Sequence, residues 1–246
     1  MHGPRLRGGR AMIRKYAFRG EDVAADILQR YGFDGELARI YATNRDYEVH
    51  KWHHYIPLYD RYLARFRGSG VRFLEIGVAK GGSLQMWRRF LGEKAVIFGI
   101  DIRKDCARFD GLFGQVRIGS QDDPAFLGAV VDEMGGIDVV LDDGSHRMSH
   151  VAAALDALYP RLSVGGVYMV EDLHAAYWKG FEGGIDAQAN FFNTVRAMID
   201  DMHRRYHHQD LKLPQLGGAF GGIHVHDSLV VIEKDAGPEP VHSRVS

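Results

Sequence analysis

Apolar and polar stretches alternate along the chain in a way that predicts strands separated by helices. Short apolar runs predict buried strands at residues 71–77, 95–101, 115–121, 137–144 and 165–173. The stretches between them carry apolar residues at helical spacing and predict helices at residues 82–92, 124–134 and 150–162. Strands that alternate with helices predict a mostly parallel sheet covered on both faces, which right-handed crossovers make doubly wound.

The two ends of the chain add further elements. Val23, Ile27 and Tyr31 follow one another at four-residue spacing, which is typical of an amphipathic helix. The additional helices are expected over residues 21–31, 57–66 and 187–206, and a terminal hairpin over residues 221–234, turning near Asp227 and Ser228. We therefore predict an α/β, Rossmann-like fold with a seven-stranded sheet, a C-terminal antiparallel hairpin and an N-terminal helical extension.

These patterns divide the chain into four expected segments. Residues 1–20 are a basic flexible tail, and residues 21–68 are a helical, aromatic-rich segment that could act as a lid. Residues 69–236 form the α/β domain, and residues 237–246 are a flexible C-terminus.

Charge and composition exclude several classes of protein. The formal net charge is −1, so no overall basic field favours nucleic acid as a partner. The chain lacks an apolar run long enough to span a membrane. Cys106, the single cysteine, cannot form an internal disulfide, which favours a reducing compartment. We expect a cytoplasmic protein with no membrane span and no nucleic-acid partner.

The first half of a candidate site follows the first two predicted strands. Gly77, Gly81 and Gly82 let the backbone turn tightly before a helix and approach a ligand closely. Asp101 ends the next strand, where an acid can accept hydrogen bonds from a ribose diol. A nucleoside ligand is therefore expected, either a dinucleotide or S-adenosylmethionine. Glu75 favours the latter, because its carboxylate would repel a pyrophosphate.

The second half follows the fourth and fifth predicted strands. These strands should be neighbours, so Asp143, Glu171 and Asp172 can converge on one cation. An all-oxygen set of carboxylates suits Mg²⁺ or another hard divalent cation. The alternative is that these acids cap helices or pair with arginines such as Arg147.

His146 lies three residues beyond the first of these acids. A cation bound beside it would lower the pKa of a coordinated hydroxyl, and an imidazole is then well matched as the general base. The pattern predicts that His146 deprotonates the acceptor.

Several motifs together resemble the class I S-adenosylmethionine-dependent methyltransferases, and more narrowly the metal-dependent sugar O-methyltransferases. The latter include the mycinamicin- and macrocin-type enzymes, the rhamnosyl O-methyltransferases and the proteins once called cephalosporin hydroxylases. The segments that carry the resemblance are "FLEIGVAKGGSLQMW", "IFGIDI", "IGSQDD", "VVLDDGSH", "GGVYMVEDLHAAYW" and "DSLVVIEK", within residues 41–234. The larger macrolide enzymes of this group carry an added N-terminal domain, and from its length we expect this chain to have no room for one.

The resemblance implies roles for individual residues. Glu75 and Gly77 would hold the methionine part of S-adenosylmethionine, Asp101 its ribose, and Ser120, Gln121 and Asp122 would lie near the adenine. The implied cofactor-binding set is Glu75, Gly77, Gly81, Ser83, Asp101, Ser120, Gln121, Asp122 and Asp142. Asp143, Glu171 and Asp172 match the acids that bind Mg²⁺, and His146 matches the base.

The acceptor side is less defined by the motifs. Family members often have an aspartate–lysine pair where this chain has residues 43–46, so Arg45, His54 and Tyr55 are expected only as parts of a lid over the ligands. The expected acceptor-lining residues are His54, Tyr55, Tyr177 and Trp178, with Trp52 and the loop at 179–186 beside them.

The resulting hypothesis is methylation of a sugar hydroxyl in a glycosylated natural product or glycolipid, by a protein that forms a homo-oligomer. The alternatives are a catechol- or phenol-type O-methyltransferase, a nicotinamide-dependent oxidoreductase, and a non-enzymatic cofactor sensor.

Overall fold

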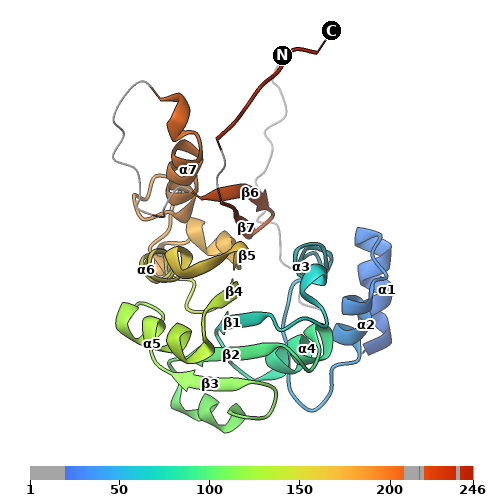
Figure 1. The fold of residues 1–246 in the computed structure, drawn as a ribbon. Helices are drawn as coiled ribbons and strands as arrows, with labels where there is room; N and C mark the ends of the chain where they lie inside the picture. The colour runs from blue at the N-terminus through green and yellow to red at the C-terminus, as the bar shows by residue number, and fades with distance from the viewer. Residues whose placement is uncertain (1–19, 208–215, 217–218, 237–238, 246) are drawn as a thin grey trace, which may run out of the picture.

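The structure is a computed structural model that describes residues 20–207, 216, 219–236 and 239–245. A single seven-stranded sheet runs through the centre, with helices on both faces (Figure 1). The strands are β1 (Arg72–Ile76), β2 (Val96–Asp101), β3 (Gln115–Ile118), β4 (Ile137–Asp142), β5 (Leu162–Val170), β6 (Phe220–His226) and β7 (Leu229–Lys234).

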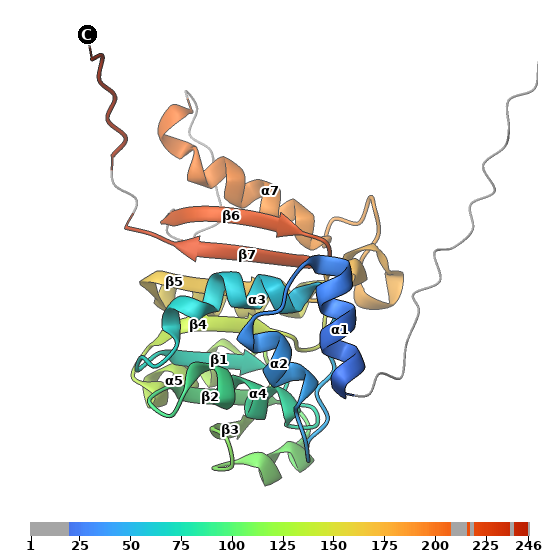
Figure 2. The ribbon, with the colours of Figure 1, turned by 90° about the vertical axis from the view of Figure 1, so that its right-hand side faces the viewer.

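The strand order is β3-β2-β1-β4-β5-β7-β6, which Figure 2 shows from bottom to top. The first five strands are parallel, and the hairpin β6–β7 joins them antiparallel through β7. The order reverses direction at β1 and β4, so the carboxyl ends of these two strands flank the switch point where such folds bind ligands. This is the doubly wound sheet with a C-terminal hairpin that the sequence predicts.

The helices divide into two groups, one on each face of the sheet (Figure 1). One face carries α1 (Gly20–Tyr31), α2 (Glu36–Ala42), α3 (Tyr55–Leu63) and α4 (Gly82–Leu91). The other carries α5 (Pro124–Met134), α6 (Met148–Leu158) and α7 (Phe191–Met202). Short 3₁₀ turns lie at Ala64–Phe66, Lys104–Phe109, Tyr159–Arg161, Leu173–Tyr177, Lys179–Phe181 and Arg204–Tyr206.

Alternate residues of each strand supply the two cores, because successive side chains point to opposite faces. In β1, Phe73 packs with the α1–α4 side, whereas Leu74 and Ile76 pack with the α5–α7 side. Burial of both faces explains why the strands are continuous apolar runs rather than alternating ones. Because the sheet is packed on both faces, the carboxyl ends of its strands are held at fixed positions relative to one another.

Several element boundaries differ from the sequence prediction. The sequence does not predict α2, because seven residues are too few for a helical period to stand out. α3 begins two residues earlier than expected, since Pro57 is tolerated in the first turn of a helix. The helix expected over 187–206 is shorter, because Asn190 caps it by accepting a hydrogen bond from the backbone N–H of Phe192.

Two expectations are not tested by the described chain. The basic tail at 1–20 lies almost entirely outside the described residues, and the segment division stays a prediction.

Among the described residues, no helix combines the length and apolar character needed to cross a bilayer.

Candidate active site

The carboxyl ends of β1, β4 and β5 meet at one edge of the sheet. Asp142 is in register with Ile76 of β1 and with Val170 of β5. The backbone N–H of Asp143 donates to Ile76 O at 2.9 Å, and that of Glu171 donates to Asp142 O at 2.9 Å. Because the ladder hydrogen bonds continue past the strand ends, the acids that follow each strand are held at fixed positions.

Gly77 joins the two halves of the site. Its φ of +99° lies in a region that favours glycine. A Cβ at this position would lie 2.1 Å from the carbonyl oxygen of Asp143. The turn after β1 can therefore pack against the turn after β4 only because residue 77 has no side chain.

Glu75 lies fully buried at the cofactor half of the site. Its carboxylate accepts hydrogen bonds from Ser83 Oγ at 2.7 Å and from Trp87 Nε1 at 3.1 Å. Burial raises the pKa of Glu75 to about 7, although the Lys51 ammonium and these hydrogen bonds oppose the shift. Ser83 thus positions Glu75 and brings the first turn of α4 to the end of β1.

Asp101 organises the glycine-containing turn from the end of β2. Its Oδ2 accepts hydrogen bonds from the backbone N–H groups of Val78 and Ala79, at 3.1 and 2.9 Å. Its Oδ1 accepts one from the N–H of Arg103 at 2.8 Å. The acid expected at the ribose therefore also holds the loop that would approach the ligand.

Gln121 and Asp142 form a buried pair beside this loop. Gln121 Nε2 donates to Asp142 Oδ1 at 3.2 Å, and Gln121 Oε1 accepts from the N–H of Ser145 at 2.7 Å. Burial raises the pKa of Asp142 to about 7. Ser120 donates to Asp122 close by. The residues expected near an adenine are thus gathered at the ends of β3 and β4.

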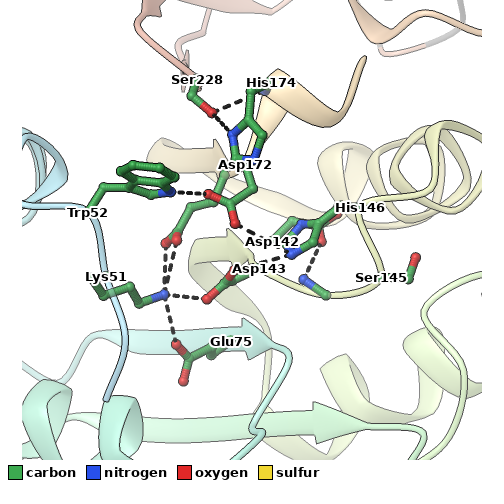
Figure 3. A network of polar contacts seen from close by, with 12 residues as sticks. Lys51, Trp52, Glu75, Asp142, Asp143, Ser145, His146, Asp172, His174 and Ser228 are labelled. Carbon is green, nitrogen blue, oxygen red and sulfur yellow. Dashed lines mark hydrogen bonds and ion pairs between the residues drawn. The ribbon is translucent and has the colours of Figure 1, made fainter. Parts of the chain in front are cut away.

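The reactive half is a cluster of Asp143, His146 and Asp172 (Figure 3). One ligand atom from each lies within 4.8 Å of the others. His146 Nε2 lies 3.7 Å from Asp143 Oδ1 and 3.7 Å from Asp172 Oδ2. His146 and Asp172 have φ angles of +56° and +53°, which non-glycine residues seldom adopt. Such strain occurs most often at functional sites.

Each carboxylate of this cluster has one oxygen held by the protein. Asp172 Oδ1 accepts hydrogen bonds from Trp52 Nε1 at 2.9 Å and Tyr55 OH at 3.0 Å. Asp143 Oδ2 accepts one from Lys51 Nζ at 2.5 Å. Within the described chain, Asp143 Oδ1 and Asp172 Oδ2 receive no hydrogen bond, and they face His146. Two oriented oxygens with a partly open side fit Mg²⁺, which uses few protein carboxylates and keeps several waters.

Glu171 lies apart from this cluster, although the sequence groups it with Asp172. The two residues are adjacent at the end of β5, and their side chains diverge. Glu171 is 2% exposed and accepts hydrogen bonds from Lys51 Nζ at 3.0 Å and Tyr59 OH at 2.6 Å. Burial and the neighbouring Asp143 charge raise the pKa of Glu171 well above its ordinary range. Its role as a metal ligand stays a prediction.

Lys51 is a site residue that the sequence does not predict. Burial alone would lower the pKa of its ammonium, but the charges of Asp143, Glu171 and Glu75 outweigh burial and raise it well above the ordinary value. The available signal is a lysine within the aromatic segment 47–59, whereas the sequence prediction names Arg45 from this region, and only as part of a lid. Pairings between residues 92 and 120 positions apart cannot be inferred from local spacing.

The expected acceptor-lining residues have different surroundings. Tyr55 is fully buried and holds Asp172, and His54 Nε2 lies 3.1 Å from Asp227 O. Tyr177 and Trp178 are 53% and 45% exposed. Trp178 packs against His174, with ring centroids 4.7 Å apart. Tyr177 and Trp178 are therefore exposed whereas Tyr55 is buried, and the acceptor-lining roles of all four residues stay predictions.

Arg147 does not neutralise the site acids. It pairs with Glu182, which also accepts a hydrogen bond from the N–H of Ser149 at 3.0 Å. This contact fastens the loop at 179–184 to the start of α6 and places the Phe181 ring 6.5 Å from the His146 ring. The structure therefore does not show the alternative in which Arg147 forms an ion pair with the acids of the site.

Comparison with known proteins places the relatives of this chain among methyltransferases. Residues 74–173 match the family model described as a methyltransferase domain. A tetracenomycin rhamnosyl 3'-O-methyltransferase from Streptomyces olivaceus is 34% identical over 88% of this chain and 58% of its own length. Demethylmacrocin O-methyltransferase from Streptomyces fradiae is 31% identical over 96% of this chain and 62% of its own length.

A solved structure shares the fold. The MycE methyltransferase from the mycinamycin biosynthetic pathway, in complex with Mg, SAH and mycinamycin VI, has a TM-score of 0.71 and 29% identity. The match covers 88% of this chain and 54% of that one. The chain thus spans little more than half the length of these relatives. Residues 74–173 thus resemble a methyltransferase domain, and over most of its length the chain is similar to sugar O-methyltransferases.

Proposed function

We propose that this protein is a Mg²⁺-dependent O-methyltransferase that transfers the methyl group of S-adenosylmethionine to a sugar hydroxyl of a glycosylated small molecule. The observation that carries the proposal is the position of His146. Its Nε2 faces one free oxygen of each of two carboxylates, next to a loop of the kind that holds a nucleoside. The relatives, whose names specify rhamnosyl and macrolide acceptors, support a sugar as the methylated group.

The cofactor half would orient the methyl donor. Asp101 holds the turn after β1 and can accept from a ribose, while Glu75 can accept from the α-amino group of the methionine part. S-adenosylmethionine would supply a sulfonium methyl group, which an oxygen nucleophile attacks in line. Holding the two reactants in this geometry removes much of the entropic barrier.

The reactive half would prepare the hydroxyl. A divalent cation held by Asp143 and Asp172 would make that hydroxyl more acidic. His146 Nε2 is then the base that accepts the proton from that hydroxyl. The left-handed backbone at residue 146 turns the ring towards both carboxylates. Trp178 and Tyr177 lie at the exposed rim, where the rest of the acceptor would rest.

The test is methyl transfer measured by mass spectrometry across a panel of acceptors, with Mg²⁺ and after chelation. The panel contains deoxysugar glycosides, the matching aglycones, and simple catechols. We expect a mass increase of one methyl group on the glycosides only, lost on chelation. Methylation of catechols in place of glycosides would support the catechol-type alternative. NADH binding without S-adenosylhomocysteine binding would exclude both.

The quaternary state is a separate prediction. A homo-oligomer is expected, and light scattering coupled to size-exclusion chromatography would test it. Titration with duplex and single-stranded oligonucleotides would test the expectation that nucleic acid is not a partner.

A further inference from the structure

A single buried ammonium group holds three carboxylates at the centre of the site (Figure 3). Lys51 Nζ lies 2.5 Å from Asp143 Oδ2, 3.0 Å from each oxygen of Glu171 and 3.8 Å from Glu75 Oε1. The lysine side chain is 2% exposed. Three carboxylates this close would repel one another, so the ammonium is what allows them to share one buried pocket.

The same lysine uses the oxygens that a cation would need. Both oxygens of Glu171 accept hydrogen bonds from Lys51, and one also accepts from Tyr59, so the protein already engages both oxygens of this carboxylate. Asp143 is shared, with one oxygen on Lys51 and the other facing His146. A divalent cation at Asp143 Oδ1 would therefore lie close to the ammonium, and the two positive charges would repel each other.

We propose that Lys51 acts as an internal substitute for the divalent cation, and that cation binding displaces its ammonium from Asp143 and Glu171. Glu171 then exchanges Lys51 for the cation and completes an acidic set with Asp143 and Asp172. This inference rests on the proposed function, because it assumes the cation site described there.

The position of Lys51 in the chain gives the displacement a structural consequence. Lys51 and Trp52 are neighbours in the segment between α2 and α3, and both contact site acids. The same segment packs on the start of α4, beside the turn expected to hold the cofactor. A Cβ on Gly82 would lie 2.3 Å from the carbonyl oxygen of Glu48. Release of Lys51 would loosen this segment beside both ligands while Trp52 keeps its hydrogen bond to Asp172.

The first test is calorimetric titration of Mn²⁺ into the wild-type protein and Lys51→Met, without any methyl donor. Competition predicts that the variant binds Mn²⁺ at least tenfold more tightly, because the competing charge is gone. Lys94→Met, which removes an exposed lysine between α4 and β2, is the matched control and should bind as wild type. Equal or weaker binding by a folded Lys51→Met would overturn the proposal.

The second test uses only the wild-type protein and decides the matter if Lys51→Met does not fold. An amine-acylating reagent labels accessible lysines, and mass spectrometry quantifies the label at Lys51 relative to exposed Lys94. Saturating Mg²⁺ should raise relative labelling of Lys51 at least fivefold. Labelling that does not change despite demonstrated Mg²⁺ binding would contradict displacement. If the wild-type protein binds no divalent cation, the metal dependence of the proposed function fails as well.

Discussion

The two halves of the site treat their carboxylates differently. At the ends of β1 and β2, both oxygens of Glu75 and of Asp101 accept hydrogen bonds from the protein. At the ends of β4 and β5, Asp143 and Asp172 each keep one oxygen free, and the backbone at His146 and Asp172 is left-handed. The first pattern is that of a preorganised binding surface, and the second is that of a site still to be completed by a ligand.

This difference indicates which acids shape the pocket and which take part in chemistry. Acids whose oxygens are all hydrogen-bonded fix the loops around a ligand at little cost when the ligand is absent. Half-satisfied, partly exposed acids keep coordination capacity for a cation. Substitutions in the first half should therefore alter cofactor binding and loop stability, whereas substitutions in the second half should alter metal binding and turnover.

The largest expected effect is on turnover in His146→Ala. Loss of the general base should reduce the rate of methyl transfer by about 10²–10⁴-fold, measured in single-turnover experiments. S-adenosylhomocysteine affinity should stay within about twofold of wild type. His150→Ala is the comparison variant, because it removes a nearby histidine that is hydrogen-bonded to Ser145. Its rate of methyl transfer should fall by much less than about 10²-fold. A His146→Ala enzyme with wild-type turnover would refute the base assignment.

Asp143→Asn should have the next largest effect. The substitution keeps the size of the side chain but weakens both the cation site and the contact with Lys51, so Mg²⁺-stimulated methyl transfer should fall by about 100-fold. Titration of activity with Mg²⁺ measures this. Asp132→Asn, at an exposed residue near the C-terminal end of α5 that pairs with Arg161, is the control. Undiminished stimulation by Mg²⁺ in Asp143→Asn would exclude this residue as a ligand.

Glu75→Gln should change the pH dependence of stability. The pKa of Glu75 is raised to about 7 in the folded protein, from an ordinary value of about 4.5. The folded state therefore keeps a proton that the unfolded state releases, and stability present below pH 4.5 is lost as pH rises through 7. Between pH 5 and 8, wild type should lose about 2 kcal/mol more unfolding free energy than Glu75→Gln.

Urea denaturation of both proteins at the two pH values measures this difference. Asp142, whose pKa is also raised to about 7, titrates in both proteins and cancels from the comparison. Parallel stability curves for wild type and Glu75→Gln would show that Glu75 is already ionised at pH 5 in the folded state.

The smallest expected effect is that of Trp52→Phe. The substitution keeps an aromatic ring but removes the hydrogen bond to Asp172 Oδ1, while Tyr55 still holds that oxygen. Residues that orient metal ligands typically contribute about tenfold or more to affinity, and here the second donor should limit the loss of Mn²⁺ affinity to about tenfold. A Trp52→Phe protein that also loses cofactor affinity would show that the two halves are not independent.

Much of the fold follows from the sequence because burial on both faces of the sheet leaves long apolar runs. The strand ends follow too, since an acid that ends an apolar run stands out, and Glu75, Asp101 and Asp143 are predictable for this reason. The divergence of Glu171 and Asp172 is not predictable in the same way. Adjacent residues at a strand end point to different sides, and which side is buried depends on α3 and Tyr59 packing there.

Residues of the N-terminal segment are the least predictable part of the site. Lys51, Trp52 and Tyr55 contact acids that are 92 to 120 positions away in the chain. Neither charge patterning nor helical period specifies such pairs, since they arise only when α3 packs beside the end of β5. The sequence predicts that Tyr55 lines the acceptor pocket, which stays a prediction, but it does not predict the hydrogen bond from the Tyr55 hydroxyl to Asp172 Oδ1.

The most direct test of the two-halved site is a pair of titrations on Asp172→Asn, one with S-adenosylhomocysteine and one with Mn²⁺. We expect S-adenosylhomocysteine to bind within twofold of wild type, because Glu75, Asp101 and their loop are intact. We also expect Mn²⁺ binding to be lost or weakened by at least tenfold. Loss of S-adenosylhomocysteine binding, or Mn²⁺ binding equal to that of wild type, would contradict the two-halved site.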